Sequence, residues 1–157
     1  MTEAEKRGRD AAISGFAHEH IVAGILMKRY GNVSLVDLPL SPYDIVIVFK
    51  TDHGENIIRA QVKTAQKSVS FTGGGRGGVD RTYISDIKVY RQSTKTCDVV
   101  IGVHPRELDA YDLYFVPAVL IENLSLKSPL VKGAKHKNNN YRMLNLAQST
   151  VQQSPRN

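Results

Sequence analysis

Two apolar segments with the residue preferences of β-strands follow one another in the first half of the chain. Residues 44–49 form a β-branched and aromatic run that begins at an aspartate, and residues 56–63 form a second extended segment. The polar stretch 51–55 separates them and contains a glycine, which is typical of a turn. The pattern therefore predicts a β-hairpin.

The open end of this hairpin carries polar side chains of opposite charge. A turn centred on His53 and Gly54 would place Asp44 opposite Lys63. Gln61 and Lys63 lie two residues apart, so they share one face of their strand, and in this register Asp44 shares it too. An acid, an amide and an ammonium group would then converge. The simpler interpretation is a cross-strand ion pair between Asp44 and Lys63, which contributes about 0.2 to 1 kcal/mol.

A long amphipathic helix is predicted before the hairpin, over about residues 4–30. Its largely apolar stripe follows three- and four-residue spacing and consists of Ala12, Gly15, Phe16, Glu19, Val22, Ala23, Leu26 and Tyr30. Glu19 lies in the middle of this stripe. A carboxylate that faces a core is costly unless it is paired, protonated or bound to a cation. We expect Glu19 to be the fourth member of the polar group; the alternative is a side chain that reaches solvent at the helix edge.

The second half of the chain contains two more predicted strands. Residues 98–103 form a buried strand, and residues 111–116 form its hairpin partner. A short helix is expected over residues 118–123. Residues 67–71 are predicted to be a short extended piece, whereas residues 83–90 fit a strand or a helix.

The length and composition suit one α/β domain. The chain has 157 residues, of which 41% are hydrophobic, and we place the domain at residues 1–147. Residues 148–157 are expected to be a flexible tail. The N-terminus is polar, and no run approaches the roughly 18 apolar residues of a membrane span. Secretion and membrane spanning are therefore not expected, and the sequence predicts a cytoplasmic protein.

The charge balance favours a polyanionic partner. The chain has 21 Lys and Arg against 15 Asp and Glu, a formal net charge of +6, which favours nucleic acid and predicts binding that weakens with salt. The basic residues at and after the hairpin are Lys63, Lys67, Arg76, Arg81, Lys88, Arg91 and Lys95. Of these, we expect Lys67, Arg76 and Arg81 to contact DNA, as a wall beside a phosphate track would.

Two segments have two interpretations each. Residues 73–78 contain five glycines and cannot pack a core of their own. They could close over DNA with Arg76, or they could form a flexible surface hairpin. A second basic cluster is either a DNA-contacting extension or a solvated loop; its members are Lys127, Lys132, Lys135, Lys137 and Arg142.

Other chemistries lack the residue spacing that they need. The five histidines show no HExxH spacing and have no cysteine partners, so a zinc site is disfavoured. Cys97 is the only thiol and precedes an apolar strand, so we expect a reduced core residue. Residues 73–78 lack the Lys-Ser/Thr ending of a phosphate-binding loop, and no G-x-S-x-G signature of a serine hydrolase is present.

Taken in order, Glu19, Asp44 and the tripeptide Gln61-Val62-Lys63 resemble the motif of the PD-(D/E)XK nuclease superfamily. The residues around this motif are most similar to those of small homing and restriction-type endonucleases with Gln in place of the usual acid. The resemblance covers about residues 10–120. It implies a restriction-endonuclease-like α/β core, in which a central mixed β-sheet is flanked by helices.

The resemblance also implies a role for each residue. Asp44, Glu19 and the backbone carbonyl of Val62 would bind the metal, and Lys63 would orient the attacking water or stabilise charge. Gln61 takes the position of an acid, but an amide oxygen brings no charge, so we expect fewer or weaker metals than at an all-acid site. Mg²⁺ is the expected cofactor, with Mn²⁺ as a substitute, and both one-metal and two-metal chemistry remain open.

The implied activity is Mg²⁺-dependent hydrolysis of DNA phosphodiester bonds by an endonuclease of restriction or homing type. A Holliday-junction resolvase with the same site is one alternative, and a non-catalytic DNA-binding protein with a decayed nuclease site is another. The expected partner is double-stranded DNA. Cutting both antiparallel strands requires two sites related by a two-fold axis, so a homodimer or homotetramer is expected.

Overall fold

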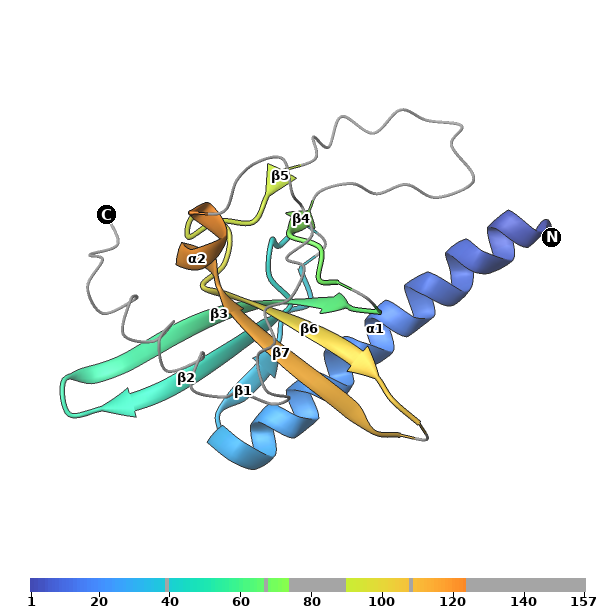
Figure 1. Cartoon of the computed structure of the whole chain (residues 1–157). Helices are drawn as coiled ribbons and strands as arrows, with labels where there is room; N and C mark the ends of the chain where they lie inside the picture. The colour runs from blue at the N-terminus through green and yellow to red at the C-terminus, as the bar shows by residue number, and fades with distance from the viewer. Residues whose placement is uncertain (39, 67, 74–89, 108, 124–157) are drawn as a thin grey trace.

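The computed structural model describes the whole chain except residues 39, 67, 74–89, 108 and 124–157 (Figure 1). The helices are α1 (Glu3–Tyr30) and α2 (Ala118–Glu122). The strands are β1 (Val33–Leu35), β2 (Ile45–Thr51), β3 (Gly54–Thr64), β4 (Thr72–Gly73), β5 (Tyr90–Arg91), β6 (Val99–Pro105) and β7 (Tyr111–Pro117).

Five strands form one mixed sheet in the order β1-β2-β3-β6-β7. The central pair β3 and β6 is parallel, and the other neighbours are antiparallel. Strands β4 and β5 pair separately as a small antiparallel sheet. Figure 1 shows α1 across one face of the large sheet, with α2 directly after β7. The predicted α/β fold with a central mixed sheet is confirmed.

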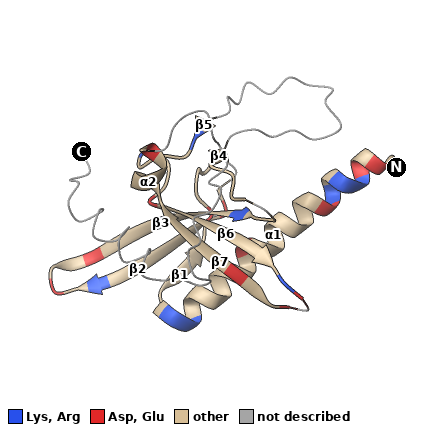
Figure 2. Ribbon diagram, in the orientation of Figure 1, with Lys and Arg blue, Asp and Glu red and all other residues tan. Residues whose placement is uncertain are grey.

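The two ends of α1 carry the residues that begin and end helices. Thr2 and Glu5 form a capping box, in which each side chain bonds to the backbone N–H of the other residue. Gly31 follows the last turn with φ 76°, a conformation that favours glycine, and its N–H donates to the Met27 carbonyl. Acidic residues occupy the first turn and basic residues the last, as the helix dipole prefers (Figure 2).

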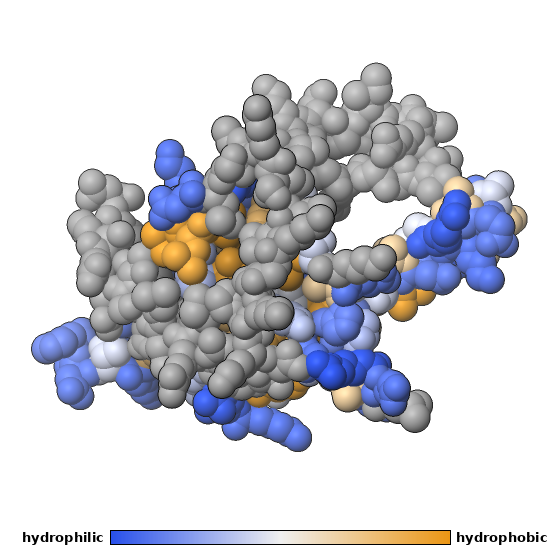
Figure 3. All heavy atoms as spheres, in the orientation of Figure 1, coloured by the Kyte–Doolittle hydropathy of each residue, from blue (hydrophilic) through white to orange (hydrophobic). Residues whose placement is uncertain are grey.

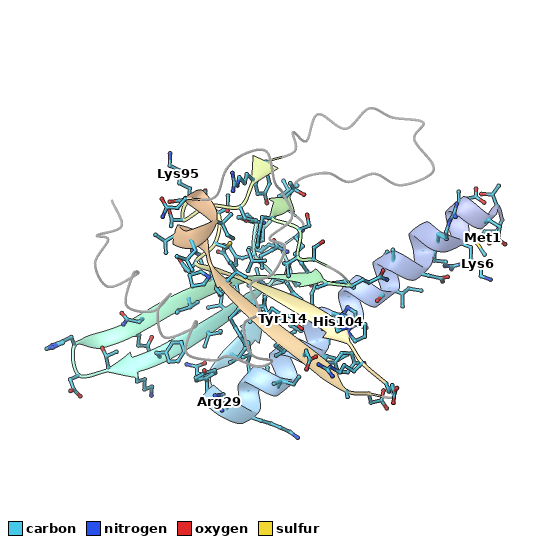
Figure 4. All side chains as sticks on the ribbon, in the orientation of Figure 1. Met1, Lys6, Arg29, Lys95, His104 and Tyr114 are labelled. Carbon is cyan, nitrogen blue, oxygen red and sulfur yellow. The ribbon has the colours of Figure 1, made fainter. Side chains whose placement is uncertain are left out.

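The core-facing stripe of α1 is shorter than the sequence predicts. Val22, Ala23 and Leu26 are buried against the sheet, but Ala12 is exposed and Phe16 is 65% exposed. A helix of 28 residues is about 42 Å long, whereas a seven-residue strand spans about 23 Å. The N-terminal half of α1 therefore extends past the sheet, where Figure 4 shows Met1 and Lys6 at its tip.

The predicted register of the β2–β3 hairpin is wrong by two residues. Thr51 pairs with Gly54 and Lys50 with Glu55, so Asp52 and His53 form the turn. The Thr51 hydroxyl donates to the Gly54 carbonyl and accepts from the His53 N–H, and Gly54 has φ 122°, which favours glycine. A slip of two residues leaves every side chain on its predicted face because strand side chains alternate with a period of two.

Two apolar clusters stabilise the sheet. The larger joins α1 to β1, β2, β3, β6 and β7, and the smaller consists of Phe71, Cys97, Val100, Val116, Ala118 and Ile121. Cys97 is buried and free, as expected. Figure 3 shows apolar side chains at the surface over α2, where Leu120 is 37% exposed.

The remaining predicted elements have mixed outcomes. Residues 99–105 and 111–117 form the expected antiparallel hairpin, and the short helix ends at Glu122 with Asn123 as its C-cap. Of the extended piece expected at 67–71, the described residues 68–71 belong to neither β3 nor β4 and directly precede β4. Residue 67 and residues 74–89 lie outside the described part of the chain. No described helix is long and apolar enough to cross a membrane.

Candidate active site

Asp44 lies at the point where the β2–β3 ladder ends. Its backbone N–H donates to the Ala60 carbonyl at 2.9 Å, one residue before the first regular pair of Ile45 with Ala60. Its carboxylate oxygen Oδ2 accepts from the backbone N–H of Val62 at 2.7 Å and also from the side-chain amide of Gln61. The Asp44 carboxylate therefore takes the place of a backbone carbonyl as the acceptor for the Val62 N–H of β3. Its side chain contacts Gln61, and not Lys63 as the predicted register had placed it.

Burial dominates the electrostatics of Asp44. It raises the pKa of this carboxyl, while the Val62 N–H and the charge of Lys63 oppose the increase. Among the described residues, no close ion pair joins Lys63 to Asp44. The simple interpretation of these two residues as a cross-strand ion pair is therefore wrong, since the Lys63 charge acts on Asp44 without a salt bridge.

Glu19 lies on α1, which contacts the C-terminal end of β3. The preceding residue, His18, is buried, and its Nδ1 lies 2.8 Å from the hydroxyl of Thr64, the last residue of β3. Burial raises the pKa of Glu19 to about 7; the negative charge of Asp44 adds to the increase, and His20 and Lys63 reduce it. Glu19 is thus electrostatically coupled to the hairpin residues.

The predicted site residues come from both sides of the sheet: Gln61 and Lys63 lie on one face of β3, and Glu19 lies on the helix that covers the other face. Ala60 and Val62 pack in the cluster that contains the α1 side chains, so Gln61 and Lys63 point toward the opposite face of β3. Glu19 belongs to the helix on the Val62 side. The charge of Lys63 lowers the pKa values of both Asp44 and Glu19, and the charge of Asp44 raises the pKa of Glu19, so the three groups interact at the end of the ladder, which is the candidate site.

A fully buried glutamine, Gln92, joins the site in the structure. Its Nε2 donates to Oε1 of Gln61 at 3.3 Å, and its backbone N–H donates to the Phe71 carbonyl at 2.7 Å. Gln92 lies in a polar stretch without strand or helix periodicity and is separated from Gln61 by 31 positions. No signal in a single sequence relates the two, so the sequence analysis missed it.

The proposed basic wall is only partly described. Lys67, Arg76 and Arg81 lie outside the described residues, as do the basic residues near the C-terminus. Arg91 donates to the Ile121 carbonyl at 2.7 Å and so interacts with α2. Figure 4 shows the Lys95 side chain pointing outward beside α2.

The oxygen atoms at the site suit a hard divalent cation. The carboxylates of Asp44 and Glu19 interact electrostatically, and the Val62 carbonyl accepts from the same Gln61 amide nitrogen that donates to Asp44. Oxygen ligands of these types are the ones that Mg²⁺ prefers. The described residues contain no cluster of three His, Cys, Asp or Glu side chains that could hold a metal. A cation here would therefore depend on neutral oxygens as well as on the two acids.

Comparison with known proteins gives a match at the level of the fold. The chain resembles a solved structure described as "The structure of a bacterial homing endonuclease: I-Ssp6803I", with a TM-score of 0.54 and 17% sequence identity. The match covers 92% of this chain and 98% of that chain. No family model and no curated protein sequence matches the chain. The chain thus has the fold of this endonuclease.

Proposed function

We propose that this protein is a divalent-cation-dependent DNA endonuclease of homing or restriction type. The observation that carries the proposal is the contact of Asp44 with Gln61 and the Val62 N–H at the end of the ladder, where the charges of Glu19 and Lys63 also act. A fold shared with a bacterial homing endonuclease supports this assignment. The net charge of +6 supports a polyanionic substrate.

The residues divide the chemistry among them. Asp44, Glu19 and the Val62 carbonyl would hold Mg²⁺ or Mn²⁺, which when bound lowers the pKa of a coordinated water and neutralises phosphate charge. Lys63 supplies a point charge on a flexible stem, which can orient the attacking water and stabilise the developing negative charge. Val62 N–H and the Gln61 amide hold the Asp44 carboxylate in one orientation.

One observation favours a second candidate, a DNA-binding protein without catalysis. The Gln61 amide turns its nitrogen toward Asp44 and its oxygen toward Gln92, so in this arrangement Gln61 adds neither charge nor an oxygen donor to the site. A site with two acids would bind a cation more weakly than one with three. Binding of DNA without cleavage in either Mg²⁺ or Mn²⁺ would support this second candidate.

Cleavage assays with single variants test the nuclease proposal. The protein is incubated with a plasmid library in Mg²⁺ or Mn²⁺, and the broken ends are sequenced to identify the target. We expect Asp44→Ala and Lys63→Ala each to reduce cleavage at least about 100-fold, because the first removes a proposed ligand of the cation and the second removes a positive charge at the reacting phosphate. Folding, followed by circular dichroism, and DNA binding in EDTA should remain close to wild type.

The matched control is Lys50→Ala, which removes an exposed lysine of β2 near the hairpin turn. This variant should cleave like the wild type, so a general loss of positive charge cannot explain the Lys63 result. Full cleavage by Asp44→Ala or by Lys63→Ala would refute the nuclease assignment at this site. Sequence-independent cleavage of four-way junctions would instead select a junction resolvase.

A further inference from the structure

Gln92 is a fully buried polar residue that the proposed chemistry does not use. It lies directly after β5, its exposed fraction is 0%, and its side-chain amide contacts Gln61 behind the candidate active site. A buried amide group without a partner costs about 1 to 3 kcal/mol, so the large majority of buried amides are hydrogen-bonded. The contacts of Gln92 therefore report which way its amide points.

Two donors determine the direction of the Gln92 amide. The Thr96 hydroxyl has two acceptors within reach, Oε1 of Gln92 at 2.6 Å and the Ser93 carbonyl at 3.0 Å, and the shorter contact favours donation to Gln92. The Cys97 thiol donates to the same Gln92 oxygen at 3.4 Å. Burial raises the pKa of Cys97 to about 12, so the thiol keeps its proton at neutral pH and remains a donor. With both donors at Oε1, the amide nitrogen of Gln92 faces Gln61.

The same direction passes through Gln61 to Asp44. Because Oε1 of Gln61 accepts from Gln92, the amide nitrogen of Gln61 is turned to the Asp44 carboxylate. The opposite orientation would bring the amide oxygen of Gln61 against Oδ2 of Asp44, and two acceptors repel each other. The hydrogen bonds thus form a chain from Thr96 through Gln92 and Gln61 to Asp44, and the Gln61 amide nitrogen also donates to the Val62 carbonyl at 3.3 Å.

We propose that Gln92 is a positioning residue, which holds Gln61 as a hydrogen-bond donor to the metal-binding carboxylate of Asp44 and not as a metal ligand. This inference rests on the proposed function, because it assigns Asp44 to a cation. It also gives a physical reason for an amide at this position: a glutamate could not donate to Asp44 at neutral pH. Partners of this kind commonly tune metal affinity.

The first experiment tests the contact in the ion-free protein and does not depend on activity. Side-chain amide resonances are recorded by ¹H–¹⁵N NMR, and those of Gln61 are assigned by their loss in Gln61→Met. We expect Gln92→Met to shift the Gln61 resonances and to leave those of the exposed Gln66 in place. Unmoved Gln61 resonances in Gln92→Met would overturn the inference.

The second experiment measures Mn²⁺ affinity by calorimetry in a double-mutant cycle. Gln92→Met should weaken Mn²⁺ binding about tenfold in the wild-type background and should have no further effect in the Gln61→Met background. A merely structural role would lower the melting temperature in both backgrounds without changing the Mn²⁺ dissociation constant. Equal losses of Mn²⁺ affinity in both backgrounds would also overturn the inference.

Thr96→Val provides a milder second variant if Gln92→Met does not fold. It removes one donor to Gln92 and should weaken Mn²⁺ binding less than Gln92→Met does; an unchanged affinity would count against the inference.

Different results would refute the proposed function and the role of Gln92. A wild-type protein that binds no Mn²⁺ refutes the proposed function and this inference with it, whereas a wild type that binds Mn²⁺ and cleaves, with a Gln92→Met variant of equal affinity, refutes only this inference.

Discussion

Burial and the charge of Asp44 raise the pKa of Glu19 to about 7, so this carboxyl is half protonated at neutral pH in the ion-free protein. A raised carboxyl pKa means that the ionised form is less stable in the folded state than in the unfolded chain. An acid retained where it destabilises the fold is typical of a functional position. The ionised Glu19 carboxylate therefore lowers the free energy of unfolding of the ion-free protein.

Glu19→Gln should therefore stabilise the ion-free protein, and the gain should depend on pH. The folded pKa is raised from 4.5 to about 7, so the stabilising contribution of the neutral carboxyl is present below pH 4.5 and is lost as the pH rises through 7. The variant should gain on the order of 1 kcal/mol at pH 8, after allowance for solvent screening, and almost nothing at pH 4. Denaturant unfolding in EDTA at both pH values measures the difference.

Glu107→Gln, at an exposed carboxylate in the β6–β7 turn, is the matched control. It should change the unfolding free energy by a similar small amount at both pH values. A Glu19→Gln variant that behaves like this control would show that Glu19 carries no unusual cost.

Gln61→Glu exchanges a donor to Asp44 for a second carboxylate at a position that is 9% exposed. The two acids would repel each other, so the ion-free variant should lose about 1 to 3 kcal/mol of unfolding free energy. Mn²⁺ should raise its melting temperature more than it raises that of the wild type, because a cation relieves the repulsion. Equal Mn²⁺ effects in the two proteins would place Gln61 outside the reach of the ion.

The exposed Gln66 offers a control of the same chemistry away from the contact with Asp44. Gln66→Glu should leave both the stability and the Mn²⁺ effect close to wild type.

That Asp44, Gln61 and Lys63 share one face of the sheet could be predicted from sequence, because a register error of two residues leaves every side chain on the same face. The contact of Gln61 with Gln92 could not, because it joins two distant segments, one of which has no periodicity.

At the scale of the elements, the β2–β3 hairpin determines which residue faces Asp44. The strands were predictable from their apolar runs, but the turn was not, because Asp52-His53 and His53-Gly54 are both acceptable two-residue turns. The observed pairing uses Gly54 after the turn, where φ is 122°. The register of the site therefore depends on one glycine.

Gly54→Ala should destabilise the protein by about 1 to 2 kcal/mol, because a side chain strains the backbone at positive φ even though no atom lies within 4 Å of the added methyl group. Gly15→Ala is the control within α1, where the added methyl group also meets no atom within 4 Å. This second variant should stabilise the protein by about 0.5 to 1 kcal/mol. Thermal unfolding compares the two; a stabilised Gly54→Ala would contradict the observed turn.

The length of α1 shows a limit of sequence patterns at this scale. Its bounds follow from the capping residues and Gly31, and they were predicted to within about one residue. The extent of its buried face was not, because the apolar stripe continues through Ala12 and Phe16 although both are exposed. Helix periodicity reports an orientation, whereas burial depends on the size of the neighbouring layer.

At the scale of the whole molecule, the chain is similar to the solved endonuclease along almost its full length, although few residues are identical. Two sequences with so few identical residues can share a fold because core positions require only suitable size and polarity. The order of Glu19, Asp44 and Lys63 along the chain was visible in the sequence, and the structure places Asp44 directly before β2 and Lys63 on the neighbouring strand β3. The residues through which subunits would contact one another have no such recognisable order in a single sequence.

Under the proposed function, one subunit would cleave one DNA strand, so cutting a duplex would need two functional subunits. Assemblies that contain one wild-type and one Asp44→Ala subunit, purified through two different affinity tags, should therefore nick a supercoiled target plasmid without linearising it. Gel electrophoresis separates the nicked, linear and supercoiled forms. Mixed assemblies of wild-type and Lys50→Ala subunits are the control and should linearise the plasmid at the wild-type rate. Linear product from the Asp44→Ala mixture at an undiminished rate would mean that a single site cuts both strands in succession.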